Sequence, residues 1–322
     1  MSAVLKTLHA VKAGETSEAE AVGTPQKVKL ALQETRILVL GTQVLLGFAY
    51  QAFFYPAFDK LTETQRALLL IGLALLILVL TLLLAPTMFH RLAYAGYDDA
   101  HVYIFANRMA AAALLPFALA IGLSMYVVIG RAAGDAAATA LGGAFTLLAL
   151  GVWYAAGLAK RKPEQWMSAM ERQQPKSEPT PLRERIERVM SETRIILPGV
   201  QALLGFQFAA VLTDAFERLP ESDKLVHVAG LAAVGLSVIL LMAPAAYHRL
   251  VTGGEATSDV LQFAHYALLA SMVPLAFSLA ADFYIVLDKV LENPGTAAAA
   301  AAVSAALMLA AWFALPLARR AG

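Results

Sequence analysis

The chain has 322 residues, of which 59% are hydrophobic and 15% charged, and its formal net charge is +1. Soluble domains average about 45–50% apolar and about 25% charged residues, so this composition indicates a membrane protein, and the small net charge excludes a global basic field for nucleic acid. The sequence contains no cysteine, which excludes disulfides, thiolate metal sites and cysteine nucleophiles.

The N-terminal segment, residues 1–33, carries lysines such as Lys6 and Lys12 but contains no apolar run of signal-peptide length. We therefore expect it to be a cytoplasmic arm, and we expect the first transmembrane helix itself to direct insertion into the membrane.

Four apolar segments follow the arm, and each is about as long as a helix must be to cross a bilayer. They lie at about 37–57, 67–89, 104–130 and 136–159. We interpret residues 34–159 as a first four-helix membrane unit.

Residues 160–191 form a linker to the next apolar region. Its first part contains Pro163, Pro175, Pro179 and Pro181, which prevent one continuous helix. Its last part, from Leu182, places apolar residues at helical spacing among arginines and glutamates. This basic amphipathic stretch either extends the next helix into solvent or lies on anionic lipid.

Four further apolar segments lie within a second unit over residues 192–318. Their approximate positions are 195–216, 225–247, 260–287 and 296–317. The eight segments predict an all-α polytopic membrane protein with eight transmembrane helices.

The two units match each other at a constant offset of 158 residues, the separation of Glu34 from Glu192. The matched positions include Glu-Thr-Arg, His-Arg-Leu and two prolines, which a shared apolar composition would not align in one frame. We interpret the match as a tandem duplication. Because four is an even number of spans, both units enter the membrane from the same face and form parallel repeats.

Lysines and arginines gather on one face of this topology, where the arm, the linker and the tail with Arg319 and Arg320 lie. The positive-inside rule assigns that face to the cytoplasm. We expect a multi-pass protein of the bacterial inner (plasma) membrane with both termini in the cytoplasm and the lipid bilayer as its partner.

The most prominent polar motifs lie at the cytoplasmic helix ends. Glu-Thr-Arg begins the first helix of each unit and His-Arg-Leu ends the second helix, so the two motifs of a unit lie at the same depth. We expect them to pair within each unit, because carboxylate–guanidinium pairs are strong and both motifs complement the helix dipole. The residues concerned are Glu34, Arg36, His90 and Arg91 in the first unit and Glu192, Arg194, His248 and Arg249 in the second. Each cluster is either a structural clamp at the membrane interface or a gate, which the histidine could make pH-sensitive.

Gln43 and Gln201 lie two helical turns deeper than the arginines, and Gly47 and Gly205 follow them one turn later. Such a stripe suits close helix packing with an interhelical hydrogen bond. Alternatively, the two glutamines face each other across the pseudo-twofold axis and line a pathway.

Other polar residues within the spans are further pathway candidates, because ionisable groups inside a membrane are usually functional. They are Asn107, Arg108, His265 and Asp282. Polar groups otherwise gather near the two faces, and the first unit has no acid deep in a span, which argues against a proton-coupled carrier.

Pro116 and Pro274 lie near the middle of the third helix of each unit. Each frees the carbonyl four residues earlier, at Ala112 and Ala270, from its helical hydrogen bond. The two prolines either set a static kink or act as hinges.

No pattern in the sequence predicts an enzyme, a metal site or a bound cofactor. There is neither a Ser-His-Asp set nor a glycine-rich phosphate loop. His90 and His248 form a symmetric pair that could ligate a haem between the units, but the arginine that follows each histidine at a helix end favours an interface anchor.

Two strings in the second unit carry a family resemblance. LPGVQALLGF at residues 197–206 and APAAYHRL at residues 243–250 resemble bacterial four-helix membrane proteins of domain-of-unknown-function family 6328. The resemblance covers both units, and the first unit departs from it at Leu40, where the second has Pro198. Members are sometimes labelled sodium:proton antiporters. The resemblance implies a single-unit ancestor that worked as a dimer, so that this chain is a fused pseudo-dimer.

Three functions are compatible with these observations. We favour a transport protein, either an ion channel or a carrier of ions or small solutes, whose cytoplasmic mouth is gated by the Glu/Arg/His cluster. The alternatives are a non-transporting structural or partner-binding membrane protein and a haem- or quinone-binding redox protein. Assembly into a further homo-oligomer is left open.

Overall fold

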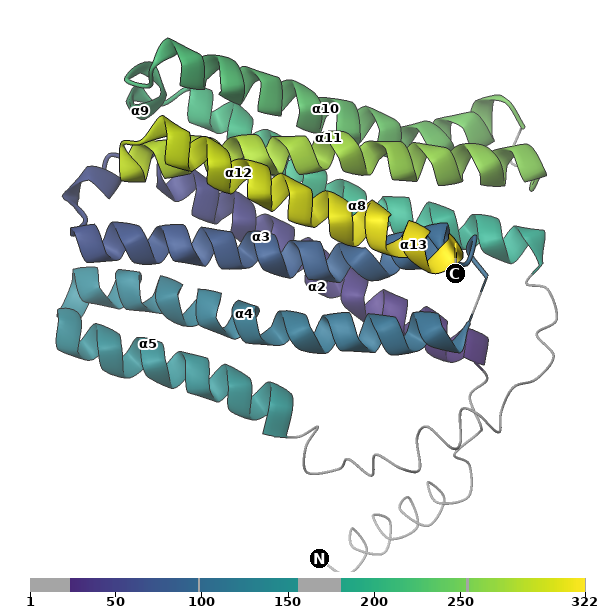
Figure 1. The fold of residues 1–322 in the computed structure, drawn as a ribbon, viewed down its shortest axis with the longest axis horizontal. Coiled ribbons are helices and arrows are strands. Elements are labelled where there is room, and N and C mark those ends of the chain that lie inside the picture. Colours follow the sequence, from purple (N-terminus) through teal and green to yellow (C-terminus); the bar gives the residue numbers. More distant parts are fainter. Residues whose placement is uncertain (1–23, 98, 156–180, 253–254, 322) are drawn as a thin grey trace, which may run out of the picture.

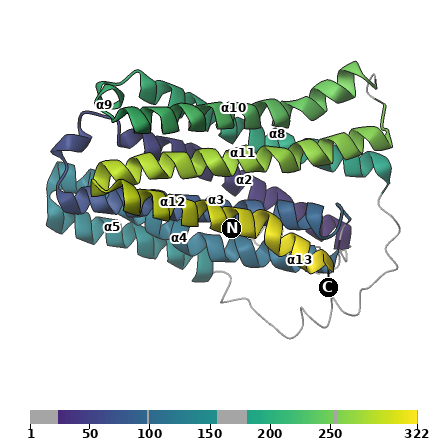
Figure 2. The same cartoon turned by 45° about the horizontal axis from the view of Figure 1, so that its top comes forward.

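The computed structural model describes residues 24–97, 99–155, 181–252 and 255–321 (Figure 1). These residues form long helices joined by short turns, and no strand occurs among them. The long helices run side by side along the length of the molecule (Figure 1, Figure 2). The all-α prediction is confirmed.

The described part of the first unit consists of long helices, the last of which passes into a π turn. They are α2 (Thr24–Ala52), α3 (Glu63–Leu92), α4 (Ala100–Ala133), α5 (Asp135–Leu150) and the π turn η2 (Gly151–Ala155), with the short 3-10 helix η1 (Phe58–Lys60) after α2. The predicted cytoplasmic arm lies mostly outside the described residues; its last part belongs to α2.

The second unit repeats this pattern. Its elements are α8 (Leu182–Val211), the short α9 (Asp214–Glu217), α10 (Glu221–Leu250), α11 (Ser258–Leu291), α12 (Pro294–Leu309), the π turn η3 (Ala310–Ala314) and α13 (Leu315–Ala321). The proline-rich part of the linker lies outside the described residues, whereas the amphipathic stretch from Leu182 is continuous with α8. We call the end of the bundle where α2 and α8 begin the linker end, and the opposite end the far end.

Seven helical segments among the described residues are long and apolar enough to cross a membrane, which indicates a multi-pass membrane protein. They are Glu63–Leu92, Ala100–Ala133, Asp135–Tyr154, Leu182–Val211, Glu221–Leu250, Ser258–Leu291 and Pro294–Arg320. The first predicted span, α2, is absent from this set although it has 29 residues. Its buried polar side chains, such as Arg36, Gln43 and Gln51, lower its hydropathy.

The first helices of the two units, α2 and α8, pack directly against each other (Figure 2). Helices α3, α4 and α5 pack in succession on one side of this pair, and α10, α11 and α12 pack in succession on the other. The end of the second unit then crosses to the first, because η3 and α13 pack on α3. The two units are therefore joined by more than the α2–α8 contact.

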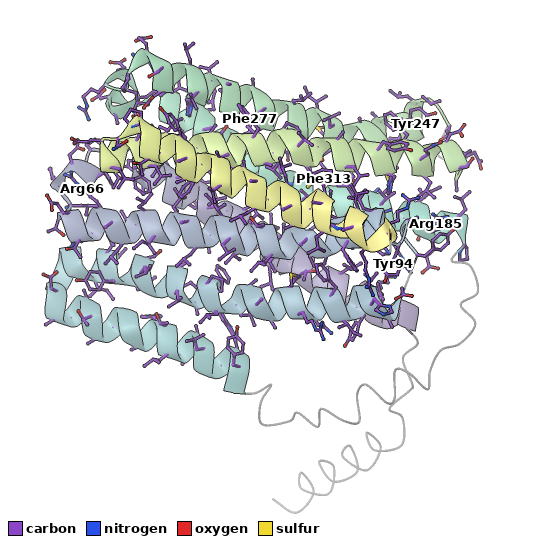
Figure 3. The ribbon with its side chains drawn as sticks, in the orientation of Figure 1. Arg66, Tyr94, Arg185, Tyr247, Phe277 and Phe313 are labelled. Carbon is purple, nitrogen blue, oxygen red and sulfur yellow. The ribbon has the colours of Figure 1, made fainter. Side chains whose placement is uncertain are left out.

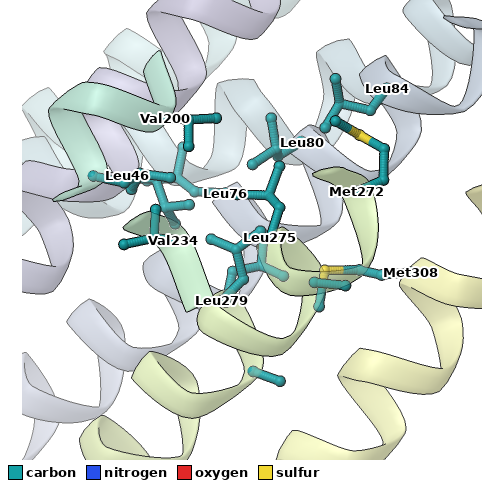
Figure 4. Close-up of a cluster of buried hydrophobic side chains, with 14 of the residues drawn as sticks. Leu46, Leu76, Leu80, Leu84, Val200, Val234, Met272, Leu275, Leu279 and Met308 are labelled. Carbon is teal, nitrogen blue, oxygen red and sulfur yellow. The ribbon is translucent and has the colours of Figure 1, made fainter. Parts of the chain in front are cut away.

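Apolar side chains fill the middle of the bundle between the two units (Figure 4). Leu46 from α2, Leu76 from α3, Val200 from α8, Val234 from α10 and Leu275 from α11 are all buried there. Because lipid is as apolar as these side chains, this layer is stabilised by close packing rather than by removal from water.

Each π turn carries an aromatic side chain that donates a hydrogen bond to a neighbouring helix, and each of these helices contains a proline. Trp312 Nε1 in η3 donates to the carbonyl of Thr81 in α3 at 3.0 Å, five residues before Pro86. The Tyr154 hydroxyl in η2 donates to the carbonyl of Ala111 in α4 at 2.6 Å, five residues before Pro116. The carbonyls that the prolines free are those of Leu82 and Ala112. Each donor binds the carbonyl one residue earlier, in a region where lipid offers no donor.

We expect Trp312→Phe to lower the free energy of unfolding by about 0.5–1.5 kcal/mol, because the Thr81 carbonyl loses a buried donor. Thermal unfolding of the purified protein in detergent would measure the loss. Trp153→Phe is the matched control, since the described contact of Trp153 is ring stacking on Phe117, which phenylalanine retains. Equal melting temperatures for the two variants would contradict the role of the Trp312 hydrogen bond.

Candidate functional site

Glu192 on α8 is the centre of a buried ionic cluster at the linker end. Its side chain is 1% exposed, and it accepts hydrogen bonds from Arg91 Nε on α3 at 2.6 Å and from Arg36 Nη2 on α2 at 3.2 Å. His90 Nδ1 lies 3.7 Å from the same carboxylate. We call Arg36, His90, Arg91 and Glu192 the Glu192 cluster. It joins α8 of the second unit to α2 and α3 of the first.

The Glu192 cluster fixes how the two units fit together. Removing one partner from a buried ion pair typically costs about 3–5 kcal/mol, because the remaining charge stays buried without compensation. Here a single carboxylate serves both Arg36 and Arg91, so its loss would leave two guanidinium groups unbalanced.

The prediction that Glu192 pairs with the bases of its own unit is wrong, because its ion pairs go to the first unit. Arg194 and Arg249 are exposed, and His248 is half-buried. Successive residues in a helix are rotated by about 100°, so side chains that are two residues apart point in nearly opposite directions. When Glu192 faces the interface, Arg194 therefore faces away from it.

In the first unit the same motif is turned the other way. Arg36 is buried and faces the interface. The backbone of Glu34 belongs to α2, but its side chain lies outside the described residues. The two copies of Glu-Thr-Arg thus contribute opposite charges, Arg36 from one and Glu192 from the other, to a single cluster.

A polar stripe runs along the inner face of α2 from the linker end to the far end. It consists of Arg36, Gln43 and Tyr50, which follow one another at intervals of seven residues and are all buried. Residues seven apart lie on the same side of a helix. The stripe faces α8, against which α2 packs.

The middle residue of the stripe, Gln43, fits against Gly199 on α8. Its side chain is 0% exposed, and a Cβ atom at position 199 would overlap Gln43 Oε1. Neither atom of the Gln43 amide group has a hydrogen-bond partner among the described residues. The prediction that Gln43 and Gln201 face each other is wrong, because Gln201 is exposed on α8, two positions beyond Gly199.

The end of the stripe, Tyr50, belongs to a second buried polar cluster near the far end. The Tyr50 hydroxyl lies 2.9 Å from His227 Nδ1 on α10, and His227 Nε2 lies 3.0 Å from the main-chain oxygen of Gln207 on α8. Gln207 Nε2 donates to Ser278 Oγ at 2.7 Å and also to the carboxylate of Asp282, both on α11. We call Tyr50, Gln207, His227, Ser278 and Asp282 the Asp282 cluster.

Asp282 is 6% exposed and lies nine residues before the end of α11, about 13 Å along the helix. The second unit thus places a carboxyl group well inside a candidate span, although the first unit does not. Tyr50 and Gln207 were not expected from the sequence. The one available signal was polarity within an apolar run, since the first unit has Ala49 at the position of Gln207.

A pocket of about 330 Å³ opens at the far end beside the Asp282 cluster. Asp223, Asp288 and Lys289 line it, together with Asp59, Arg218 and Glu292 from the surrounding turns. Asp223 is buried and accepts a hydrogen bond from Tyr284 at 3.3 Å. It precedes His227 by one turn of α10, so the pocket adjoins the cluster.

A second pocket, of about 230 Å³, lies at the linker end between α2 and α8. Lys29, Arg36, Arg188 and Ser191 line it, with Glu184 and Glu187. Each buried cluster therefore has an open pocket next to it.

The other predicted pathway residues lie outside both clusters. Asn107 and Arg108 are exposed on α4, and His265 is half-buried on α11, where its ring contacts Tyr266. Helices α4 and α11 continue through Pro116 and Pro274, whose role as hinges stays a prediction. Within the described ranges, no group of three or more His, Asp or Glu side chains is placed to hold a metal ion.

A family model described as "Family of unknown function (DUF6328)" matches the chain twice, at residues 20–157 and 180–316. The two matches are consistent with a tandem duplication, as the constant sequence offset predicts. No curated protein and no solved structure matches the chain significantly.

We expect Gly199→Ala to destabilise the protein by about 1–3 kcal/mol, the usual cost of overpacking a tight contact, because the new methyl group overlaps Gln43. The loss would appear as a lower melting temperature in detergent. Gly41→Ala is the matched control, since Gly41 is the repeat partner of Gly199 and has open space around it.

The pair Gly199→Ala and Gln43→Ala together should recover much of the lost stability, because the shorter side chain makes room for the methyl group. A double variant no more stable than Gly199→Ala alone would show that the contact with Gln43 is not the cause.

Proposed function

We propose that this chain, which belongs to the DUF6328 family of unknown function and carries its unit twice, is an integral membrane transport protein, an ion channel or a carrier of ions or small solutes. The observation that supports this proposal best is the buried stripe of Arg36, Gln43 and Tyr50 with an ionisable cluster at each end. Buried ionisable groups inside membrane helices are costly and are usually kept for function.

We propose eight spans, with α2 as the first, arranged as two parallel four-helix units. Arginines at helix ends support a cytoplasmic linker end in a bacterial inner membrane, with both termini on that side. Arg185, for example, lies at the linker end, where it donates to the carbonyl of Ala95 (Figure 3). The low hydropathy of α2 is explained by the side chains it turns toward α8.

The proposed path follows the contact between α2 and α8. The Glu192 cluster is the gate at its cytoplasmic mouth, and the far-end pocket is the opposite mouth. Between them, the packed layer around Leu46, Leu76 and Val200 closes the path in this conformation (Figure 4). Transport would require the two units to shift relative to each other.

The same packed layer favours the second candidate, a structural or partner-binding membrane protein without transport activity. A dry interface between the units needs no conformational change to serve that role. A flux measurement separates the two candidates, because only the first predicts movement of ions or solutes across the membrane.

We expect liposomes that contain the purified protein to show flux above empty vesicles when protons, monovalent cations, chloride and small solutes are tested in turn. Glu192→Gln should raise this flux severalfold, since Arg36 and Arg91 lose the carboxylate that holds α2 and α3 against α8. Glu255→Gln is the matched control, because Glu255 is an exposed glutamate at the same end of the bundle and lines neither of the two pockets.

Retention of the fold would be checked by melting temperature and gel filtration. If Glu192→Gln does not fold, Arg36→Gln, which leaves the Arg91–Glu192 pair in place, is measured instead. Absence of flux for the wild type and for the folded variants, across pH and every solute tested, would contradict transport and favour the structural role.

A further inference from the structure

We propose that Asp282, Tyr50 and His227 form a proton relay, which opens toward the far-end pocket. The inference rests on the proposed transport function and names the proton as its coupling ion. It concerns only the second unit and one residue of α2. At the corresponding positions the first unit has Leu69 in place of His227 and Ser124 in place of Asp282.

The hydrogen bonds fix the state of His227. The main-chain oxygen of Gln207 can only accept, so His227 Nε2 must carry a hydrogen atom and donate to it. In a neutral imidazole the other nitrogen is then an acceptor. The Tyr50 hydroxyl, 2.9 Å from Nδ1, therefore donates its proton to that nitrogen.

The oxygen of Tyr50 remains available as an acceptor on its other side. The Asp282 carboxyl group interacts with this hydroxyl. Tyr50 thus lies between an acid and a base that come from different helices, α11 and α10, and it belongs to the first unit while they belong to the second.

This order of groups allows a proton to pass without a change in the number of bonds. The O–H bond of a protonated Asp282 breaks as its proton binds the Tyr50 oxygen, and the original O–H bond of Tyr50 breaks as its proton binds His227 Nδ1. The products are an Asp282 carboxylate and a His227 imidazolium, and Tyr50 is neutral before and after. The reverse step restores the starting state.

The surroundings support both charge states. Gln207 Nε2 donates to the Asp282 carboxylate, and the Phe216 ring lies 5.1 Å from the His227 ring, close enough for a favourable cation–π contact. Asp282 Oδ1 and Gln207 Oε1 are both buried without a hydrogen-bond partner among the described residues. Asp282 Oδ1 can therefore bind an arriving proton, whereas the amide oxygen of Gln207 can only accept a hydrogen bond.

Groups from several helices surround Asp282. Helix α2 contributes Tyr50, α10 contributes His227 and Asp223, and α8 contributes the uncharged Gln207. On α11 itself, Tyr284, Asp288 and Lys289 lie toward the far end. Asp223 lines the pocket one turn from His227, so it is the group through which a proton would exchange with solvent.

Infrared difference spectroscopy of the purified full-length protein, titrated in H2O and D2O, tests the relay without a transport assay. We expect a carbonyl band of a protonated, buried carboxyl group that titrates in the wild type, disappears in Asp282→Asn and shifts in Tyr50→Phe. Asp214→Asn is the matched control, because Asp214 is an acid near the far end that is exposed. Its spectrum should match that of the wild type.

Proton flux into liposomes is the second measurement. Asp282→Asn and Tyr50→Phe should each reduce pH-driven flux by about a hundredfold, the lower end of the effect of losing a positioned proton-transfer group, while Asp214→Asn stays at the wild-type rate. Melting temperatures confirm that the variants are folded. If Asp282→Asn does not fold, Asp282→Glu and Tyr50→Phe carry the test.

The outcomes separate the two proposals. A carboxyl band that persists in Asp282→Asn, or wild-type proton flux in Tyr50→Phe, overturns the relay. Flux of another solute that ignores pH and both substitutions also overturns the relay but leaves transport standing. The expected infrared bands in a protein that carries no flux support the relay as a proton-binding site and overturn transport.

Discussion

The contact between Glu192 and the two arginines of the first unit is the constraint on which the rest of the structure depends. The glutamate and the arginine of Glu-Thr-Arg point in nearly opposite directions on a helix, so each copy of the motif can place only one of these two charged side chains at the interface. The first copy places Arg36 there, and the second places Glu192. When Arg36 and Glu192 both face the interface, α2 packs against α8, Gln43 lies against Gly199, and Tyr50 contacts His227.

The two ends of the bundle are chemically different. At the linker end one carboxylate is shared by two guanidinium groups and a histidine. Near the far end Gln207 bonds to the carboxyl group of Asp282 and to the imidazole of His227, which bonds in turn to the phenol of Tyr50. No cationic side chain among the described residues takes part in these bonds. An exact dimer would carry each kind of site twice. In this chain one copy carries each kind of site, and the matched positions of the other copy differ.

Much of the fold could be predicted from the sequence, because apolar runs of membrane length and a constant offset between repeats are local, countable signals. The choice of partners could not. Whether Glu192 faces its own unit depends on the rotation of α8 about its axis, which packing of Phe206 against Gly47 and of Gln43 against Gly199 helps to set. The roles of Tyr50 and Gln207 could not be predicted, because the sequence does not show which side chains a single polar residue in an apolar run will contact. The structure has seven candidate spans among its described residues where the sequence predicts eight, because the polar side chains by which α2 contacts the second unit lower the hydropathy of α2.

The crossing of η3 and α13 onto α3 makes each half of the chain part of the surroundings of the other. Trp312, from the last helical segment of one copy, is anchored to a carbonyl of the other copy. In two separate polypeptides this contact would have to form between the chains. Because η3 and α13 of the second copy cover α3 of the first, separation of the two halves would expose that face of α3. The covalent link between the halves holds this covering segment close to α3 at a high effective concentration.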